Sequence, residues 1–388
     1  MISLLANNIK QPIMNNKVML WIAGIIIVIG VIFYFQSNSK ENQSNTLKIG
    51  LIAPLSGDAA AYGEMGKNGA SIAVEEINTA GGINGKQIEI IYEDGKCDAK
   101  AALNAAQKLI NEDGVKYIVG GACSSETFAF VPLATASKVF VISFSASAPK
   151  LSGISKYFVR NYPNDNLVGI ALAGHLSKKY KKVAVISEKT SYAQGVKDSF
   201  TAEAKNLGIE IVGAEDFDST TVDFRTIILK IKSENPEIIF INPQSGSNTA
   251  RIAKQIRQNG ITIPLSGVNY TGPDVISGGS AVEGMEFAVP ADVPKEGKGQ
   301  EFLQKYNETY GRDPLYAYVA AAGYDDVYIL KKAIESVGED TNKVQDYIHN
   351  RLSFEGTLGK YSFDINGDLV GVGVIIQKIK NGKVELLK

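Results

Sequence analysis

Short apolar runs alternate with stretches of helical spacing along most of this chain. In the first half, the runs that predict strands are residues 47–53, 88–92, 115–119, 139–143 and 157–160. The same alternation begins again after a polar break at residues 161–166. Strands that alternate with helices in this way are typical of a parallel sheet with helices on both faces. The predicted fold class is therefore α/β, with two doubly wound parallel-sheet lobes.

A chain of 388 residues is long for one domain, which supports the division into two lobes. Residues 1–46 are expected to form a membrane anchor and a polar tether. We predict that lobe 1 consists of residues 47–162 plus 287–364 and lobe 2 of residues 163–286 plus 365–388. The chain would then cross between the lobes near residues 163, 287 and 366, and these segments would form a three-segment hinge.

Residues 18–35 contain 18 uncharged and almost wholly apolar positions. As a helix they would span about 27 Å, close to the thickness of a bilayer core. The run is longer than the core of most cleavable signal peptides, and no small-x-small site follows it, although a signal peptide remains the alternative. The sequence thus predicts an uncleaved transmembrane helix, with the folded part outside the cytoplasm, in the periplasm or at the cell exterior.

The sequence gives no support for nucleic-acid binding or catalysis. The formal net charge is −1, so there is no basic field for nucleic acid. Motifs of serine hydrolases, zinc proteases and P-loop enzymes are absent, and the two histidines, His175 and His349, lie on separate predicted helices. Gly63, Gly66 and Gly69 recur every three residues, which favours close helix packing over phosphate binding. We therefore expect no enzyme activity, no cofactor and no metal site.

Two cysteines, Cys97 and Cys123, occur in the part predicted to face outward. An even number of cysteines in an oxidising compartment favours one disulfide. Spacing alone does not prove that the two residues meet, so two buried free thiols remain the alternative.

Polar side chains follow several predicted strands. Gly120 to Thr127 reads as a strand end, a tight turn and a helix start, where Ser124 could donate to an anion or simply cap the helix. Other residues just after strands are Ser145 to Ser147 in the first lobe, and Tyr192 and Asn269 in the second. Because ligands of such sheets bind at the carboxyl ends of the strands, these residues predict a cleft for a small polar molecule, closed by a hinge.

Longer stretches add to this pattern. They include IGLIAPLSGDAAAYGEMGKNGA from Ile49, INTAGGINGKQIEIIYEDGKCDAKAA from Ile77, YIVGGACSSETF from Tyr117, VISFSASAPKLS from Val141, VAVISEKTSYAQG from Val183, DFRTIILKIKSENPEIIF from Asp223 and FEGTLGKYSFDINGD from Phe354. In these stretches the chain resembles the leucine/isoleucine/valine-binding protein family, the substrate-binding components of ABC importers with the type I periplasmic-binding fold. The pairing of Cys-Asp with Cys-Ser-Ser at this distance is the most specific feature.

The resemblance implies roles for individual residues. It implies a disulfide between Cys97 and Cys123 and a ligand carboxylate held by Ser124. It also implies that the loop after the fourth strand contacts the ligand's carboxylate and ammonium, and that two tyrosines lie near the ligand; these residues are Ser145, Ala146, Ser147, Tyr62 and Tyr192. Ordinary core packing is the alternative for each tyrosine.

One departure from the family bears on the ligand. The family's amino-acid binders place a glutamate after the strand at residues 263–266, where this chain reads Gly267-Val268-Asn269-Tyr270. Burying a ligand ammonium without a carboxylate partner costs roughly several kcal/mol, because the charge loses its hydration and gains no opposite charge. Asn269 could accept one hydrogen bond, and Asp165 is the candidate substitute for the acid. Small carboxylates, amides and aromatic acids remain open as ligands.

The resemblance implies an extracytoplasmic solute-binding protein of an ABC importer, with a permease and its ATPase subunits as partners. A ligand-sensing receptor ectodomain of the same fold, signalling through a partner, is the alternative. Only 17 residues precede the apolar run, so we expect no signalling module in this chain. A secreted enzyme would need a nucleophile and a base within reach of one another, which the two separated histidines do not provide.

Overall fold

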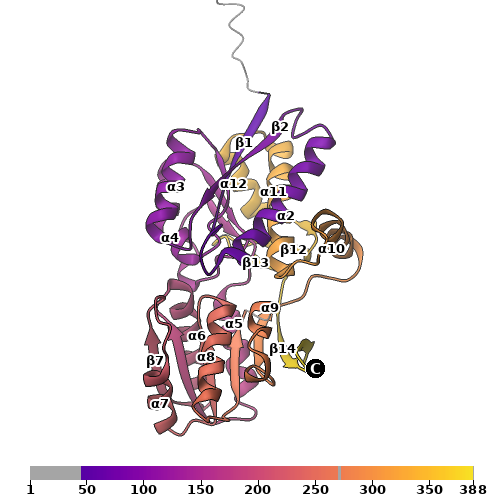
Figure 1. The fold of residues 1–388 in the computed structure, drawn as a ribbon. Helices are drawn as coiled ribbons and strands as arrows, with labels where there is room; N and C mark the ends of the chain where they lie inside the picture. The colour runs from indigo at the N-terminus through magenta and orange to yellow at the C-terminus, as the bar shows by residue number, and fades with distance from the viewer. Residues whose placement is uncertain (1–44, 270–271, 388) are drawn as a thin grey trace, which may run out of the picture. The chain divides into compact units, whose positions relative to one another are not determined.

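The chain forms two large sheets, each packed between helices (Figure 1). The computed structural model describes residues 45–269 and 272–387. The predicted transmembrane helix at residues 18–35 lies outside these described residues. Of the helices within the described ranges, none combines the length and the hydrophobicity that a membrane crossing requires.

The first sheet has five parallel strands in the order β2-β1-β3-β4-β5. Its strands are β1 (Thr46–Ala53), β2 (Gln87–Asp94), β3 (Tyr117–Gly120), β4 (Phe140–Ser143) and β5 (Phe158–Arg160). The connecting helices are α2 (Ala60–Thr79), α3 (Ala99–Asn111), α4 (Ser124–Ala136) and the short 3₁₀ helix η1 (Pro149–Leu151). The strand order reverses between β1 and β3, and ligands of such sheets bind at this reversal, beyond the carboxyl ends of the strands.

The second sheet has seven strands in the order β15-β14-β10-β9-β8-β6-β7. Its strands are β6 (Lys182–Glu188), β7 (Glu210–Phe217), β8 (Ile238–Asn242), β9 (Leu265–Val268), β10 (Glu286–Pro290), β14 (Val374–Lys380) and β15 (Lys383–Leu386). Its helices are α5 (Asp165–Leu176), α6 (Ser191–Asn206), α7 (Arg225–Ser233), α8 (Gly246–Gln258), α9 (Pro273–Ile276) and η2 (Gly279–Ala281). Strands β14 and β15 are antiparallel to their neighbours, and the others are parallel.

Strand β10 lies in the second sheet, whereas the sequence assigned residues from 287 onward to the first lobe. It pairs in parallel with β9, with Phe287 opposite Gly267, and antiparallel with β14. The side chain of Phe287 packs where a Cβ atom on Gly267 would lie, so the strand belongs with β9. The chain therefore leaves the second sheet after Pro290.

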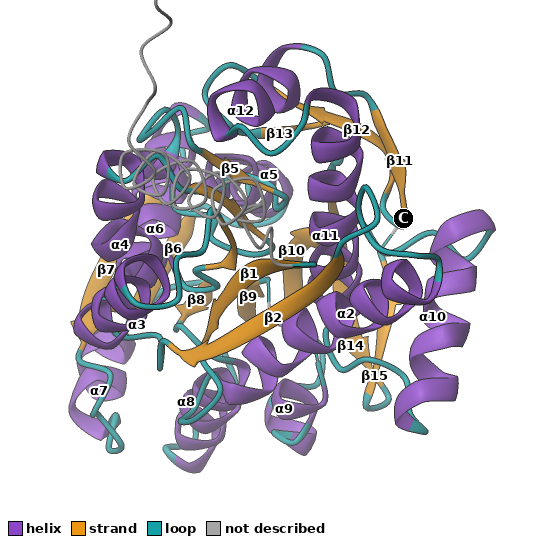
Figure 2. Cartoon of the chain, turned by 90° about the horizontal axis from the view of Figure 1, so that it is seen from above, coloured by secondary structure: helices purple, strands orange, loops and turns teal. Residues whose placement is uncertain are grey.

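The remaining elements lie between β10 and β14 in the sequence. They are α10 (Gly297–Tyr310), α11 (Ala317–Val337), α12 (Thr341–Asn350) and a small antiparallel sheet of β11 (Phe354–Gly356), β12 (Gly359–Phe363) and β13 (Leu369–Val370). Because β13 pairs with β12, this small sheet extends past the boundary predicted at residue 364. Helices α11 and α2 lie side by side although they are far apart in the sequence (Figure 2).

The glycine series in α2 packs closely, as the sequence predicts. A Cβ atom on Gly69 would overlap the carbonyl oxygen of Ala320 in α11, and one on Gly66 would overlap the ring of Phe144. A Cβ atom on Gly63 would overlap the carbonyl oxygen of Pro54. Gly323 of α11 packs against α2 equally closely, because a Cβ atom on Gly323 would overlap the carbonyl oxygen of Gly66. The spacing of three therefore serves helix packing.

Cys97 and Cys123 form a disulfide, with their Cα atoms 5.3 Å apart. The bond joins the loop after β2 to the residue that precedes α4, which confirms the predicted pairing.

We predict that the paired substitution Cys97→Ser and Cys123→Ser lowers the free energy of unfolding by about 3 kcal/mol, since the closed loop restricts the unfolded chain. Urea unfolding of the variant, compared with the oxidised parent and with the parent after reduction, measures this change. Equal midpoints for all three samples would contradict the prediction.

Candidate functional site

Helix α4 begins at Ser124, within the stretch from Gly120 to Thr127 that the sequence predicts to hold a strand end, a turn and a helix start. Cys123 is its N-cap, and the carboxylate of Glu126 accepts the backbone N–H groups of Cys123, at 3.0 Å, and of Cys97, at 2.9 Å. Burial raises the pKa of Glu126 to about 7, and these backbone hydrogen bonds oppose the rise. Ser124 therefore lies in the first turn of α4, where backbone N–H groups and the helix dipole favour an anion.

Ser124 contacts the loop after β4. Its hydroxyl oxygen accepts the backbone N–H groups of Ser147, at 3.3 Å, and Ala148, at 3.1 Å. The Ser145 hydroxyl donates to the carbonyl oxygen of Ala122 at 2.7 Å, which ties the two loops together. Ser124, Ser145, Ala146 and Ser147 are all buried, and they lie at the carboxyl ends of β3 and β4 as the sequence predicts.

Asp165 is the first residue of α5 and is fully buried. Its backbone N–H donates to the carbonyl oxygen of Ser147 at 2.9 Å, which joins the start of α5 to the loop after β4. Burial raises the pKa of its carboxyl to about 7, while the Ser147 side chain, the Arg160 charge and Asn269 act in the opposite direction. A carboxyl with this pKa changes charge near neutral pH when its surroundings change.

Asn269 connects Asp165 to Tyr192. Its amide nitrogen donates to Asp165 Oδ1 at 3.3 Å and to the Tyr192 hydroxyl at 3.0 Å. Asn269 follows β9 with φ of 58°, a left-handed conformation that asparagine adopts more readily than most residues. Among the described residues, neither Asp165 Oδ2 nor Asn269 Oδ1 has a hydrogen-bond partner, although both atoms are buried. This pair therefore presents two unpaired acceptor oxygens.

Tyr62 of α2 approaches the same cluster from the first sheet. Burial raises the pKa of Tyr62 above its usual value, and its hydrogen bond with Tyr162 lowers it in part. The negative charge of Asp165 raises the pKa of Tyr62 further. The Tyr62 phenol is thus neutral at physiological pH and lies within the field of the Asp165 carboxylate.

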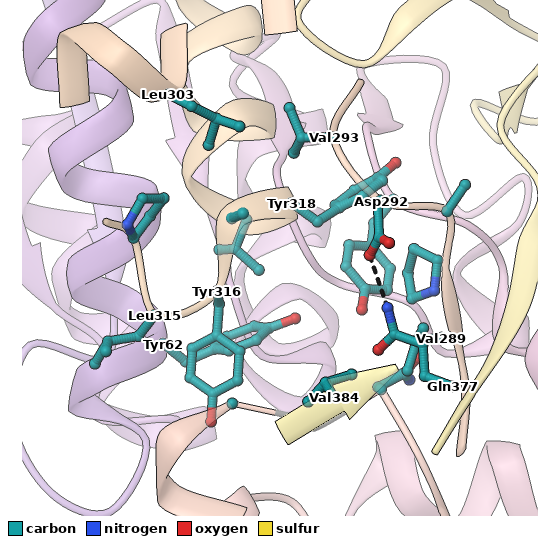
Figure 3. Close-up of a pocket in the computed structure, with 18 of the residues that line it drawn as sticks. Tyr62, Val289, Asp292, Val293, Leu303, Leu315, Tyr316, Tyr318, Gln377 and Val384 are labelled. Carbon is teal, nitrogen blue, oxygen red and sulfur yellow. Dashed lines mark hydrogen bonds between the residues drawn. The ribbon is translucent and has the colours of Figure 1, made fainter. Parts of the chain in front are cut away.

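A cavity of about 310 Å³ adjoins this cluster. Tyr62 and Asn269 line it, whereas the other predicted site residues do not. Figure 3 shows Tyr62, Tyr316 and Leu315 on one side and Val289, Asp292 and Gln377 on the other. The cavity therefore lies between α2 and the start of α11 on one side and β10 and β14 of the second sheet on the other.

Sequence reasoning missed three tyrosines of this cavity, Tyr162, Tyr316 and Tyr318. Tyr162 follows β5, and the other two stand at the start of α11. Two features of the sequence could have identified these residues: their aromatic side chains, and their positions just after a strand or at the start of a helix. Without the fold, α11 could not be assigned to the cleft, because it follows a helix and not a strand.

The comparisons with known proteins agree with this architecture. A family model described as periplasmic binding protein matches residues 46–383. A leucine-, isoleucine-, valine-, threonine- and alanine-binding protein of Pseudomonas aeruginosa is 31% identical over 340 residues, which cover 85% of this chain and 89% of that protein.

Solved structures are also similar. A leucine-binding protein from Thermotoga maritima is 28% identical with a TM-score of 0.81, covering 88% of this chain and 98% of that one. The branched-chain amino acid transporter substrate-binding protein of Streptococcus pneumoniae, solved with isoleucine, is 31% identical with a TM-score of 0.78, covering 88% and 98%. These structures have the type I periplasmic-binding architecture of two helix-covered sheets. The chain therefore belongs to the periplasmic binding protein family.

Proposed function

We propose that this protein is the extracytoplasmic solute-binding protein of an ABC importer and that it binds an amino acid by closure of two lobes. The observation that carries the proposal is the buried pair of Asp165 and Asn269. Among the described residues the pair has two oxygens without a hydrogen-bond partner, and Asp165 is joined through Ser147 to Ser124 at the start of α4. One end of this arrangement suits a carboxylate and the other an ammonium. A permease and its ATPase subunits are the partners that this role requires.

In the proposed closure, each lobe is built on one of the two large sheets. Lobe 1 contains the five-stranded sheet with α10, α11, α12 and the small antiparallel sheet, and lobe 2 contains the seven-stranded sheet. The crossings are then residues 161–164, 291–296 and 371–373. Short crossings of this kind let two lobes close on a ligand by small changes in backbone angles.

Ser124 would hold the carboxylate. Its hydroxyl oxygen already accepts two backbone N–H groups, so the hydroxyl hydrogen remains to be donated. The first N–H groups of α4 and the positive end of its dipole add to the attraction for an anion. Ser147, which lies next to Ser124 and is linked to Asp165, would complete this end of the site.

Asp165 would pair with the ammonium and thereby replace the glutamate that the family places after β9. Asn269 Oδ1 would accept a second hydrogen bond from the same group. A buried ammonium is tolerated where it is paired with a carboxylate and its remaining hydrogens find acceptors. Tyr192, which is buried and bonded to Asn269, would fix the amide in this orientation.

A close contact between the lobes supports closure. A Cβ atom on Gly195 of α6 would lie 2.7 Å from Cδ of Pro149 in η1. Helix α6 belongs to the proposed lobe 2 and η1 to lobe 1, so only the absence of a side chain at residue 195 permits this approach. The two proposed lobes thus touch at this point in the described conformation.

Titration calorimetry of the purified full-length chain with the twenty standard amino acids, small carboxylates and benzoate tests the proposal. We expect at least one amino acid to bind, with weaker binding of the matching carboxylic acid that lacks the ammonium. Binding only of acids without an ammonium would refute the role of Asp165, and binding of none of these compounds would refute the proposed function.

We predict that Ser124→Ala weakens binding of the amino acid by about 1 to 3 kcal/mol, because a buried donor to the carboxylate is lost. Calorimetry measures the affinity, and the melting temperature shows whether folding is intact. Ser137→Ala at the exposed end of α4 is the matched control. Equal affinities for both variants would remove Ser124 from the site.

The pH dependence of binding follows from Asp165. Burial raises the pKa of the ligand-free Asp165 carboxyl to about 7. A ligand ammonium pairs with the ionised carboxylate, so binding to a protein whose Asp165 is neutral releases a proton. We therefore predict that affinity falls as the pH drops below about 7, approaching about tenfold per pH unit. Calorimetry in buffers with different ionisation enthalpies at pH 6 measures the released proton, and a flat profile between pH 5 and 8 would contradict the prediction.

A further inference from the structure

The cavity beside Asn269 is larger than a short aliphatic side chain requires. Its volume is about 310 Å³. For comparison, a buried apolar cavity of about 150 Å³ holds a benzene ring. A ligand held at Ser124 and Asp165 would direct its side chain past Asn269 and Tyr62, which both line the cavity.

Four tyrosine rings line the cavity. Tyr62 packs edge to face on Tyr316, with ring centres 5.1 Å apart and planes at 66°. Tyr162 and Tyr318 form a second pair, with ring centres 5.1 Å apart and planes at 78°. Edge-to-face contacts favour a further ring over an aliphatic group of equal area. The walls are thus suited to an aromatic guest.

The remaining lining is apolar inside and polar at the exposed rim. Val289 and Val319 are buried, while Asp292 and Lys295 are exposed. Asp292 accepts a hydrogen bond from the Gln377 side chain at 2.7 Å (Figure 3). The hydroxyl of Tyr318 is buried and, among the described residues, has no hydrogen-bond partner. The lining is therefore mixed, with apolar and aromatic side chains beside the polar groups of Asn269, Asp292, Lys295 and Gln377.

We infer that the ligand of this protein is an amino acid with an aromatic side chain, whose ring occupies the cavity lined by Tyr62, Tyr162, Tyr316 and Tyr318. This inference rests on the proposed function and names the substrate class of the same site. A leucine side chain would lose the contacts that a ring makes with the four tyrosines. In this inference the cavity binds the aromatic side chain of the ligand, while Ser124 binds its carboxylate and Asp165 binds its ammonium.

The test is titration calorimetry of the full-length chain with alanine, leucine and phenylalanine. We expect phenylalanine to bind at least about tenfold more tightly than leucine, because a pocket shaped for a ring favours the ligand that carries one. Leucine binding as tightly as phenylalanine, or more tightly, would overturn the inference and leave the proposed function standing. Failure of all three amino acids to bind would overturn the inference, and failure of all twenty in the screen described above would overturn the proposed function as well.

A cavity-filling variant gives an independent readout. Ala317→Phe at the start of α11 places a ring into the cavity, and Ala136→Phe on the exposed end of α4 is the matched control. We expect Ala317→Phe to lower the ratio of phenylalanine affinity to alanine affinity at least about tenfold, and Ala136→Phe to leave the ratio unchanged. Melting temperatures show that each variant is folded. An unchanged ratio in a folded Ala317→Phe variant would contradict the inference.

Discussion

Asp165→Asn is expected to abolish amino-acid binding, with a loss of about 3 to 5 kcal/mol, the usual effect of removing one partner of a buried ion pair. Asparagine has nearly the same size as aspartate, so the packing at the start of α5 should persist. The ligand's ammonium would then be buried against amides and a phenol, with no carboxylate to balance its charge. Calorimetry with the best-bound amino acid measures the loss.

Two controls separate this effect from damage to the fold. Asp198→Asn on the exposed face of α6 is the matched substitution and should leave affinity unchanged. The ligand-free Asp165→Asn variant should melt at the same temperature as the parent or higher at pH 8. A variant that keeps the parent's affinity would show that the ammonium is held elsewhere.

The sign of the stability effect follows from the pKa of Asp165. Its value in the folded protein, about 7, lies above that of an unfolded chain. The stabilising contribution of the neutral carboxyl is therefore complete below about pH 4 and is lost as the pH rises through 7. Replacing Asp165 with a neutral amide removes this loss at pH 8.

Gly69→Ala is expected to produce the largest change in stability, about 3 kcal/mol of destabilisation or more. The added methyl group would overlap the carbonyl oxygen of Ala320, and backbone atoms on two packed helices cannot move apart without opening the interface of α2 and α11. Urea unfolding measures the change, with a lower midpoint expected for the variant.

The control for this variant is another glycine within a helix. Gly174→Ala in α5 meets no atom within 4 Å, so the helix preference for alanine should stabilise the protein by about 0.5 to 1 kcal/mol. Opposite signs for the two substitutions would show that the effect arises from packing and not from helix propensity. A neutral Gly69→Ala would contradict the packing described for α2.

Much of the fold could be predicted from local patterns. The five strands of the first sheet fall on the apolar runs of the sequence, and Asp98 caps α3 by accepting the backbone N–H of Ala101. The assignment of residues 287–290 to the first lobe was wrong, because an isolated apolar run does not specify which sheet it joins. That choice depends on β9 and on β14, which follows nearly ninety residues later in the chain.

The candidate site was predictable where residues follow strands. Ser124, Ser147, Tyr192 and Asn269 all stand at such positions, and the structure brings Asn269 and Tyr192 together with Asp165. Tyr316 and Tyr318 were beyond local reasoning, because their place in the cavity depends on how α11 packs against α2. Their roles in binding remain predictions, as do those of the residues named from the sequence.

The pairing of α2 with α11 has a consequence for synthesis. Helix α2 leaves the ribosome among the first folded elements, but its partner follows more than two hundred residues later. The glycine face of α2 must therefore stay uncovered while β6 to β10 are made, and exposed surface of this kind invites aggregation. The lobe whose strands are translated first therefore cannot be completed until α11 has been made, and defects in α11 should appear as misfolding of the N-terminal half.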